Sequence, residues 1–119
     1  MTCPFCAQNI VIETGLIYVR NDNFPVSRGH CLVIPKRHVE TWFDMSKEER
    51  QEAFELIDQV KTMLDEKYAP DGYNIGMNCG ESAGQTVPHA HIHVIPRYKG
   101  DMENPRGGVR GVIPEKQSY

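Results

Sequence analysis

A run of alternating side chains, His89-Ala90-His91-Ile92-His93-Val94, constrains the fold of this 119-residue chain more than any other feature. Strict alternation is typical of a β-strand with one face buried. On such a strand the three histidines share one side, while Ala90, Ile92 and Val94 share the other and are expected to face the core. The sequence therefore predicts a strand that presents a row of three imidazoles.

A row of imidazoles has three plausible chemical uses: it can bind a metal, supply a nucleophile with its supporting groups, or sense pH. The segment just upstream, residues 78–86 (NCGESAGQT), is polar, small and turn-prone. It is typical of a loop that brings backbone N–H groups close to an anion. We therefore expect an anion site beside the histidine row.

The rest of the chain predicts an α+β fold, with an antiparallel sheet of about five strands and one long helix packed across it. Further strands are expected at residues 10–12, 16–19, 30–34 and 73–78. Ser46 and Glu49 form a capping box, so a helix is expected to begin there and to run to about Tyr68. Its expected buried stripe comprises Ala53, Phe54, Ile57, Val60, Leu64 and Tyr68.

Length and charge exclude several classes of function. A chain of 119 residues suits one domain, residues 1–119. The formal net charge of −3 gives no bulk attraction to nucleic acid or to a membrane surface, so we expect neither as a partner. No apolar run approaches the length of a membrane span, and the N-terminus lacks the pattern of a signal peptide. These features predict a cytoplasmic protein.

Two of the four cysteines, Cys3 and Cys6, form a C-x-x-C pair. In a reducing compartment a structural disulfide network is not expected, so the pair indicates metal ligation or a redox function. The absence of a following βαβ pattern argues against a thioredoxin-like use. Cys31 lies within an expected strand and is interpreted as a small buried hydrophobe.

Two stretches carry a resemblance to a known family. Residues 84–97 (GQTVPHAHIHVIPR) resemble the signature of the histidine triad (HIT) superfamily, and residues 28–38 (RGHCLVIPKRH) resemble a second strand of the same family. The two matches occur in the order that the family shows. The resemblance implies a HIT-like fold, a homodimer in which two sheets join side by side, and a nucleotide substrate.

The resemblance also implies a role for each polar side chain near the histidine row. His91 would attack the α-phosphorus of a nucleotide, which is chemically reasonable because a neutral imidazole is a competent nucleophile near pH 7. His93 would donate to a phosphate oxygen or to the departing group. The implied supporting set comprises Asp22 on the ribose hydroxyls, Asn78, Gln85 and Thr86 on phosphate or the leaving group, and His30 as a residue that orients other imidazoles.

A structural zinc ion is the expected metal. Cys3, Cys6, His38 and His89 would supply two thiolates and two imidazoles, which is a common closed zinc set. Some bacterial and archaeal HIT proteins carry zinc at the matching positions, so the resemblance assigns His89 to the metal and not to catalysis. The zinc would anchor residues 1–9. Mg²⁺ is a further expected cofactor with polyphosphate substrates.

The expected function is cleavage at the α-phosphate of a purine nucleotide conjugate, through a nucleotidyl-histidine intermediate. The conjugate is a dinucleoside polyphosphate or a nucleoside phosphoramidate, because features of both branches of the family are present. The alternative is a nucleotide-binding regulatory module with little turnover. The basic tail, residues 104–119, is expected either to approach the polyphosphate or to be solvated.

Overall fold

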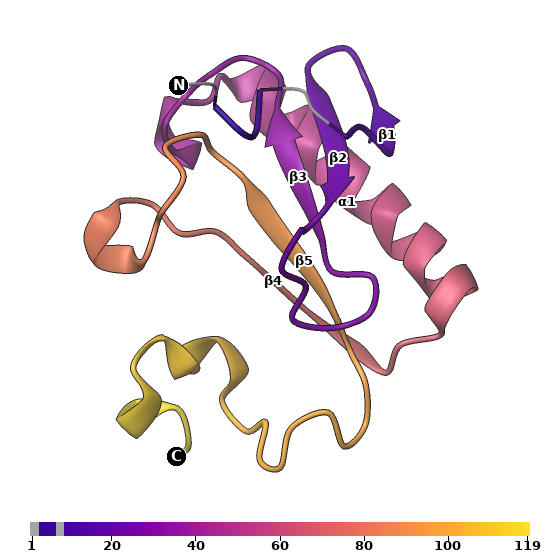
Figure 1. The fold of residues 1–119 in the computed structure, drawn as a ribbon, viewed down its shortest axis with the longest axis vertical. Helices are drawn as coiled ribbons and strands as arrows, with labels where there is room; N and C mark the ends of the chain where they lie inside the picture. The colour runs from indigo at the N-terminus through magenta and orange to yellow at the C-terminus, as the bar shows by residue number, and fades with distance from the viewer. Residues whose placement is uncertain (1–2, 7–8) are drawn as a thin grey trace.

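The computed structural model describes residues 3–6 and 9–119. Its centre is a five-stranded antiparallel sheet in the order β1-β2-β3-β5-β4 (Figure 1). The strands are β1 (Ile12–Glu13), β2 (Ile17–Asn21), β3 (Cys31–Pro35), β4 (Gly72–Gly76) and β5 (Ile92–Arg97). This architecture confirms the predicted α+β class with one long helix.

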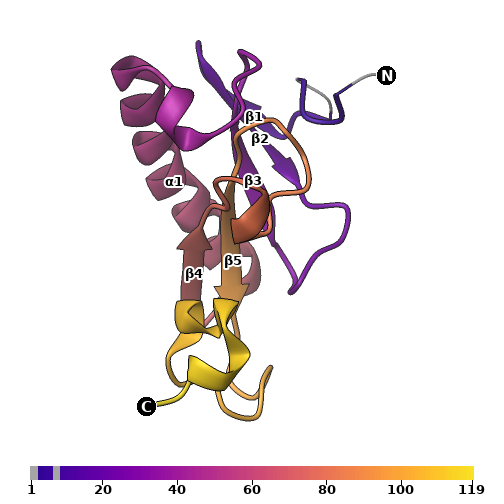
Figure 2. The same ribbon diagram turned by 90° about the vertical axis from the view of Figure 1, so that its left-hand side faces the viewer.

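The helix α1 (Lys47–Tyr68) begins and ends where the sequence predicts. The Ser46 side chain accepts from the Glu49 N–H, and the Glu49 carboxylate accepts from the Ser46 N–H, so both hydrogen bonds of the predicted capping box are present. Ala69 closes the helix in the left-handed conformation. The helix covers one face of the sheet (Figure 2), where its buried residues Ala53, Leu56, Ile57, Val60 and Leu64 meet Ile17, Val19, Val33, Ile92 and Val94.

One residue of the predicted helical stripe does not reach this core. The Phe54 side chain is 55% exposed and lies against the Trp42 ring, with the ring centroids 5.1 Å apart. Trp42 belongs to a short 3₁₀ helix, η1 (Trp42–Asp44), which precedes α1. The expectation for Phe54 was wrong because this residue lies at the margin of the stripe, where η1 and not the sheet provides the contact.

The opposite face of the sheet holds a smaller apolar cluster and the candidate site. Tyr18, Leu32 and Ile34 are almost fully buried there, with Phe5 packed against them. Phe5 comes from the N-terminal segment, which lies across the sheet from α1 (Figure 2). Strands β2 and β3 are therefore buried on both faces, which explains their nearly continuous apolar sequences.

The strand boundaries differ from the predicted ones around the histidines. The strand β5 begins at Ile92, so His89 and His91 precede it and only His93 lies on the ladder. The alternation nevertheless persists, because Ala90 is buried and its N–H donates to the Val39 carbonyl at 2.7 Å. This backbone contact to Val39, outside the sheet, thus continues the expected alternation of side chains before β5 begins.

The loop between β2 and β3 returns through Gly29, whose φ of +89° favours glycine. A Cβ at this position would lie 2.9 Å from the Tyr68 ring, so the loop passes too close to α1 for any side chain. The C-terminal segment forms two short 3₁₀ helices: η3 (Gly108–Val112), which contacts β4, and η4 (Pro114–Lys116), which contacts η3. In the part of the chain that the structure describes, no helix is long and apolar enough to cross a membrane.

Candidate active site and metal centre

The His91 ring is held by a backbone contact that defines its tautomer. His91 Nδ1 lies 2.8 Å from the His89 carbonyl oxygen. Since a carbonyl only accepts, we assign the proton to Nδ1, which leaves a lone pair on Nε2. The ring is 9% exposed, lines a cavity, and is packed edge-on against the Phe5 ring at 4.8 Å between centroids. An unprotonated imidazole nitrogen is therefore available in the cavity.

Two successive hydrogen bonds, from Val26 to His30 and from His30 to His93, fix the tautomer of His93. The Val26 N–H donates to His30 Nδ1 at 3.0 Å, so the proton of neutral His30 belongs on Nε2. His30 Nε2 lies 2.9 Å from His93 Nδ1, which must then accept. This leaves the His93 proton on Nε2. His93 is consequently a hydrogen-bond donor at the nitrogen that is not tied to His30.

Burial keeps both of these rings neutral. It lowers the pKa of His93 to about 4, with further lowering by His91 and His30 that outweighs the opposing effect of Asp22. Burial also lowers the pKa of His30, again against the Asp22 carboxylate. The tautomers assigned to His30 and His93 therefore apply at neutral pH.

Asp22 lies beside this histidine pair, at the end of β2. One carboxylate oxygen accepts from the Phe24 N–H at 2.8 Å. The other is 3.4 Å from His30 Nε2 and 3.8 Å from His93 Nδ1. Asp22 lines the same cavity as His91 and keeps acceptor capacity on its second oxygen.

The remaining predicted residues, Asn78, Gln85 and Thr86, lie in the loop after β4 and differ in where their side chains are placed. Asn78 and Thr86 line the cavity with His91 and His93. The Gln85 side chain instead binds within its own loop: its oxygen accepts from the Gly80 N–H at 2.8 Å, and its nitrogen donates to the carbonyls of Glu40 and Val87 at 2.7 and 3.0 Å. In this structure Gln85 fixes the loop and does not line the cavity.

The cavity measures about 400 Å³, which is within the range of small-molecule sites. It runs from the histidines to the N-terminal segment and the β2–β3 loop. Its lining combines the polar side chains of the histidines and Asp22 with the apolar rings of Phe5 and the 88% exposed Phe24. A ligand that combines an anion, hydroxyl groups and a flat apolar ring matches this combination of groups.

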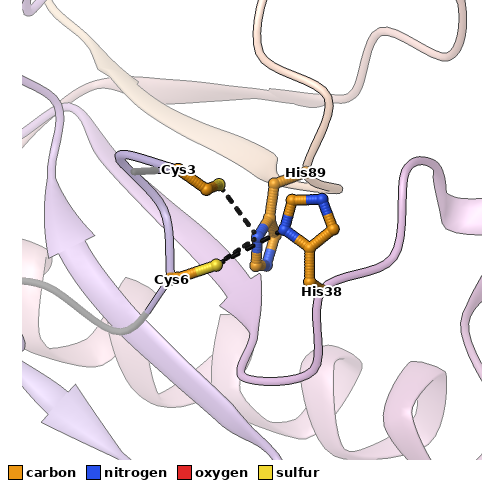
Figure 3. A group of neighbouring side chains, drawn as sticks. All are labelled: Cys3, Cys6, His38 and His89. Atoms are coloured by element: carbon orange, nitrogen blue, oxygen red, sulfur yellow. Dashed lines mark hydrogen bonds between the residues drawn. The ribbon is translucent and has the colours of Figure 1, made fainter. Parts of the chain in front are cut away.

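The four predicted metal ligands come together at the edge of this site (Figure 3). His89 Nδ1 lies 3.4 Å from Cys3 Sγ and 3.6 Å from Cys6 Sγ, and His38 Nδ1 lies 3.3 Å from Cys6 Sγ. All four ligand atoms are within 4.8 Å of one another. The segments that supply them are distant in sequence, so their spacing alone does not show that they meet.

The geometry fits a tetrahedral zinc ion. With Zn–S bonds of about 2.3 Å and Zn–N bonds of about 2.0–2.1 Å, neighbouring sulfur and nitrogen ligands lie about 3.6 Å apart. The three sulfur–nitrogen distances are close to this value. In addition, His89 Nε2 lies 2.7 Å from the Pro35 carbonyl, so its proton belongs on Nε2 and its Nδ1 lone pair faces the cysteines. Burial lowers the pKa of His89, which keeps the ring neutral for ligation.

Two residues that position the site were not expected from the sequence. Arg20 Nη1 donates to the Pro4 carbonyl at 2.8 Å, and the Tyr18 hydroxyl donates to the Phe5 carbonyl at 2.6 Å. Arg20 is only 2% exposed although it is charged. A charged residue within an otherwise apolar strand, as in Ile17–Asn21, was the available signal. These contacts hold the C-x-x-C segment against the sheet.

The histidine row, its supporting donors and this sheet define a histidine triad domain. The chain belongs to the HIT family, whose HIT domain matches residues 6–100. This confirms the resemblance found in the sequence.

Particular relatives include enzymes and a metal protein. The chain is 42% identical over 95 residues to a bis(5'-adenosyl)-triphosphatase of Dictyostelium discoideum, covering 80% of this chain and 64% of that protein. It is 40% identical over 78 residues to an asymmetrical bis(5'-nucleosyl)-tetraphosphatase of Schizosaccharomyces pombe, covering 66% and 43%. It thus spans less than two thirds of either relative.

Among solved structures, the fold is similar to that of a zinc-bound histidine triad family protein from Mycobacterium smegmatis. The TM-score is 0.78, the identity is 34%, and the match covers 87% of this chain and 81% of the other.

Proposed function

We propose that this chain is a nucleotide hydrolase or nucleotidyl transferase that acts at the α-phosphate of a purine nucleotide conjugate. The observation that carries the proposal is the bond from His91 Nδ1 to the His89 carbonyl, because it leaves the Nε2 lone pair available in the cavity. Both relatives described above are named as dinucleoside polyphosphate hydrolases. Their names support a phosphoanhydride as the bond that is cleaved.

In the first step the lone pair of His91 Nε2 forms a bond to the α-phosphorus, and the bond from phosphorus to the leaving oxygen breaks. The electron pair of that bond departs with the leaving group. His93 Nε2–H donates a hydrogen bond to the oxygen on which negative charge develops. His93 is neutral, so it stabilises this charge without losing its proton.

In the second step a water oxygen forms a bond to phosphorus. The electron pair of the phosphorus–nitrogen bond returns to His91 Nε2, and the water proton passes to solvent. Nucleoside monophosphate is released. Replacement of water by another acceptor would make the same intermediate a nucleotidyl donor.

The remaining residues would bind the nucleotide. Asn78 and Thr86 offer an amide and a hydroxyl to the phosphate, and the Asp22 carboxylate would accept from the ribose hydroxyls. Phe24 and Phe5 would contact the base. Gln85 would act indirectly, by holding the loop that contains Thr86.

Zinc would be held by Cys3, Cys6, His38 and His89, and it would act as a structural ion that ties the N-terminal segment to the sheet. Mg²⁺ with polyphosphate substrates and a homodimer also belong to the proposal. The free outer edge of β4, which pairs only with β5 among the described strands, is available to a second sheet.

The proposal predicts that His91→Ala reduces release of AMP from diadenosine triphosphate by a factor of at least about 10³, because the covalent route is removed. AMP would be quantified chromatographically, with AMP affinity measured separately. His91→Ala should still bind AMP, while the wild type, quenched during turnover, should show one added nucleotidyl group by intact mass.

The matched control is Cys79→Ser, which changes a residue of the neighbouring loop without altering an imidazole. It should retain activity close to that of the wild type. If His91→Ala retains most of the activity, His91 is not the nucleophile. If the wild type binds AMP but turns over neither a dinucleoside polyphosphate nor a phosphoramidate, the protein is a nucleotide-binding module.

A further inference from the structure

The two cysteines of the proposed metal centre lie at the ends of one tight turn. The Cys6 N–H donates to the Cys3 carbonyl at 3.3 Å, which closes a β-turn over Pro4 and Phe5. In such a turn the first and last Cα atoms lie less than about 7 Å apart, a range that a disulfide bond spans. Cys6 is exposed and Cys3 is partly exposed. The pair therefore meets two requirements for a disulfide, proximity and access to an oxidant in solution.

The same turn forms part of the wall of the nucleotide cavity. Pro4 and Phe5, the residues between the two cysteines, both line this cavity. The Phe5 ring lies edge-on against the His91 ring, with 4.8 Å between the centroids. One short segment thus supplies two metal ligands and two residues of the cavity wall. Each sulfur belongs to a residue directly next to one that lines the cavity.

The histidine half of the metal centre is held independently of the cysteines. His89 is fully buried, and its Nε2–H donates to the Pro35 carbonyl at 2.7 Å. Tyr18 and Arg20 bond to the backbone carbonyls of the turn, whereas the cysteine sulfurs link the turn to His89 and its neighbouring metal ligand (Figure 3). Loss of the sulfur contacts would therefore release the turn and leave His89 in place.

Oxidation by a peroxide would break these sulfur contacts. Bound zinc would keep both cysteines as thiolates, the form that reacts with peroxides. The exposed Cys6 thiolate attacks a peroxide oxygen, the O–O bond breaks, and hydroxide leaves, so that Cys6 becomes a sulfenic acid. The Cys3 thiolate then attacks the Cys6 sulfur, and a second hydroxide leaves as the S–S bond forms. Two electrons pass in total from the cysteine pair to hydrogen peroxide.

We propose that Cys3 and Cys6 are a disulfide modification site that lowers the nucleotide affinity of this chain through Phe5. Sulfurs in a disulfide have lost the thiolate charge that binds a metal, so the new bond removes two of the four ligands. The turn is then detached from the histidines, and Phe5 loses its fixed position against His91. The inference rests on the proposed nucleotide cavity but not on the chemical step at His91.

The test compares the reduced, zinc-loaded protein with the same protein after treatment with hydrogen peroxide. Peptide masses should show the loss of two hydrogens from Cys3 and Cys6, and a chromogenic chelator should detect release of zinc. AMP affinity, measured by calorimetry, should fall by about 5- to 10-fold. A thiol reductant with added zinc should restore all three properties, which separates the disulfide from oxidation of methionine.

Two phenylalanine variants test the route to the nucleotide. Phe5→Ala keeps both cysteines, so it should still form the disulfide and release zinc, while its AMP affinity changes by less than about 2-fold on oxidation. Phe24→Ala is the matched control, because Phe24 lines the same cavity from the β2–β3 loop. It should weaken AMP binding equally in both redox states and so keep the ratio of the wild type.

Cysteine variants test which thiols are responsible. Cys79→Ser removes the thiol of the loop after β4 and should respond to peroxide as the wild type does. Cys6→Ser should form no disulfide, and peroxide should leave its AMP affinity unchanged. A full response in Cys6→Ser, or its loss in Cys79→Ser, would overturn the assignment of the cysteine pair.

The remaining outcomes separate the oxidation step from the nucleotide site. Absence of the disulfide in treated wild type, or retention of zinc beside it, would overturn the modification site. Equal AMP affinity in the two redox states of the wild type would overturn the link to the nucleotide, and so would a redox ratio that survives Phe5→Ala. If reduced wild type does not bind AMP, the proposed function has failed and the link fails with it.

Discussion

At the scale of single residues, three identical side chains are made chemically different by the backbone oxygen or ring nitrogen that each one meets. His89 donates from Nε2 to Pro35, and His91 donates from Nδ1 to the His89 carbonyl. His93 accepts at Nδ1 from His30. Each contact fixes which nitrogen lacks a proton, so one ring presents a metal ligand, one a lone pair and one a donor.

His93 also makes stability depend on pH. Its pKa is lowered from 6.5 to about 4 in the folded protein, mainly by burial. Between these values the unfolded chain binds more protons, so stability is lost as pH falls from 7 towards 4. Replacement by glutamine, which does not titrate, should reduce the loss of stability between pH 7 and pH 5 by about 1–2 kcal/mol.

Urea unfolding of the wild type and His93→Gln at both pH values measures this difference. Both proteins share the proposed metal ligands, so the comparison removes the contribution of those residues. An identical pH dependence for the two proteins would show that His93 titrates normally in the folded state.

At the scale of elements, the start of α1 is fixed by a network around one buried carboxylate, that of Glu49. Glu49 is 3% exposed, although it is charged. Its carboxylate accepts from the Ser46 N–H at 2.7 Å and from Arg37 at 2.7 and 3.3 Å. Burial acts to raise the pKa of Glu49, but the hydrogen bonds from Arg37 and Ser46 outweigh it and lower the pKa. This network joins the helix to the segment that follows β3.

Removal of the Glu49 carboxylate should therefore destabilise the fold more than loss of an ordinary cap. We expect Glu49→Ala to cost about 2–3 kcal/mol, against about 1 kcal/mol for Ser46→Ala, because only the former breaks both the cap and the contact to Arg37. Glu48→Ala, in the same helical turn but exposed, should change stability by no more than about 0.5 kcal/mol. Chemical denaturation of the three variants checks the order; equal losses for Glu48 and Glu49 would contradict it.

At the scale of the whole molecule, the proposed zinc site joins the N-terminal segment to the end of β3 and to the segment before β5. These ligands are separated by up to 86 residues, from Cys3 to His89. A metal ion that joins segments so far apart in sequence stabilises the folded state relative to the unfolded chain. The site would also hold Phe5 against His91, so the metal would support the cavity as well as the fold.

Loss of the metal should lower thermal stability. We expect Cys6→Ser to lower Tm by about 5–10 °C and to reduce the zinc content, measured by atomic spectroscopy, from one ion per chain to near zero. Cys79→Ser removes a thiol outside the cluster and should leave both quantities unchanged. One zinc per chain in Cys6→Ser would place the metal elsewhere.

The sequence by itself determined the features that depend on local periodicity. A period of two placed Ala90, Ile92 and Val94 in the core and the histidines on the other side, and the Ser46–Glu49 pair located the start of α1. These predictions succeeded because side-chain direction and capping depend on residues a few positions apart. The proposed metal ligands were predicted only through a resemblance, since their spacing carried little information.

Only the tertiary structure decided which group each side chain meets. Phe54 is turned towards Trp42, Gln85 is bonded within its own loop, and Gly76 lies opposite His93. Each outcome depends on strand register and on packing between segments distant in sequence. A repeat of two or 3.6 residues specifies the face on which a side chain lies, but the neighbour on that face is set by the whole fold.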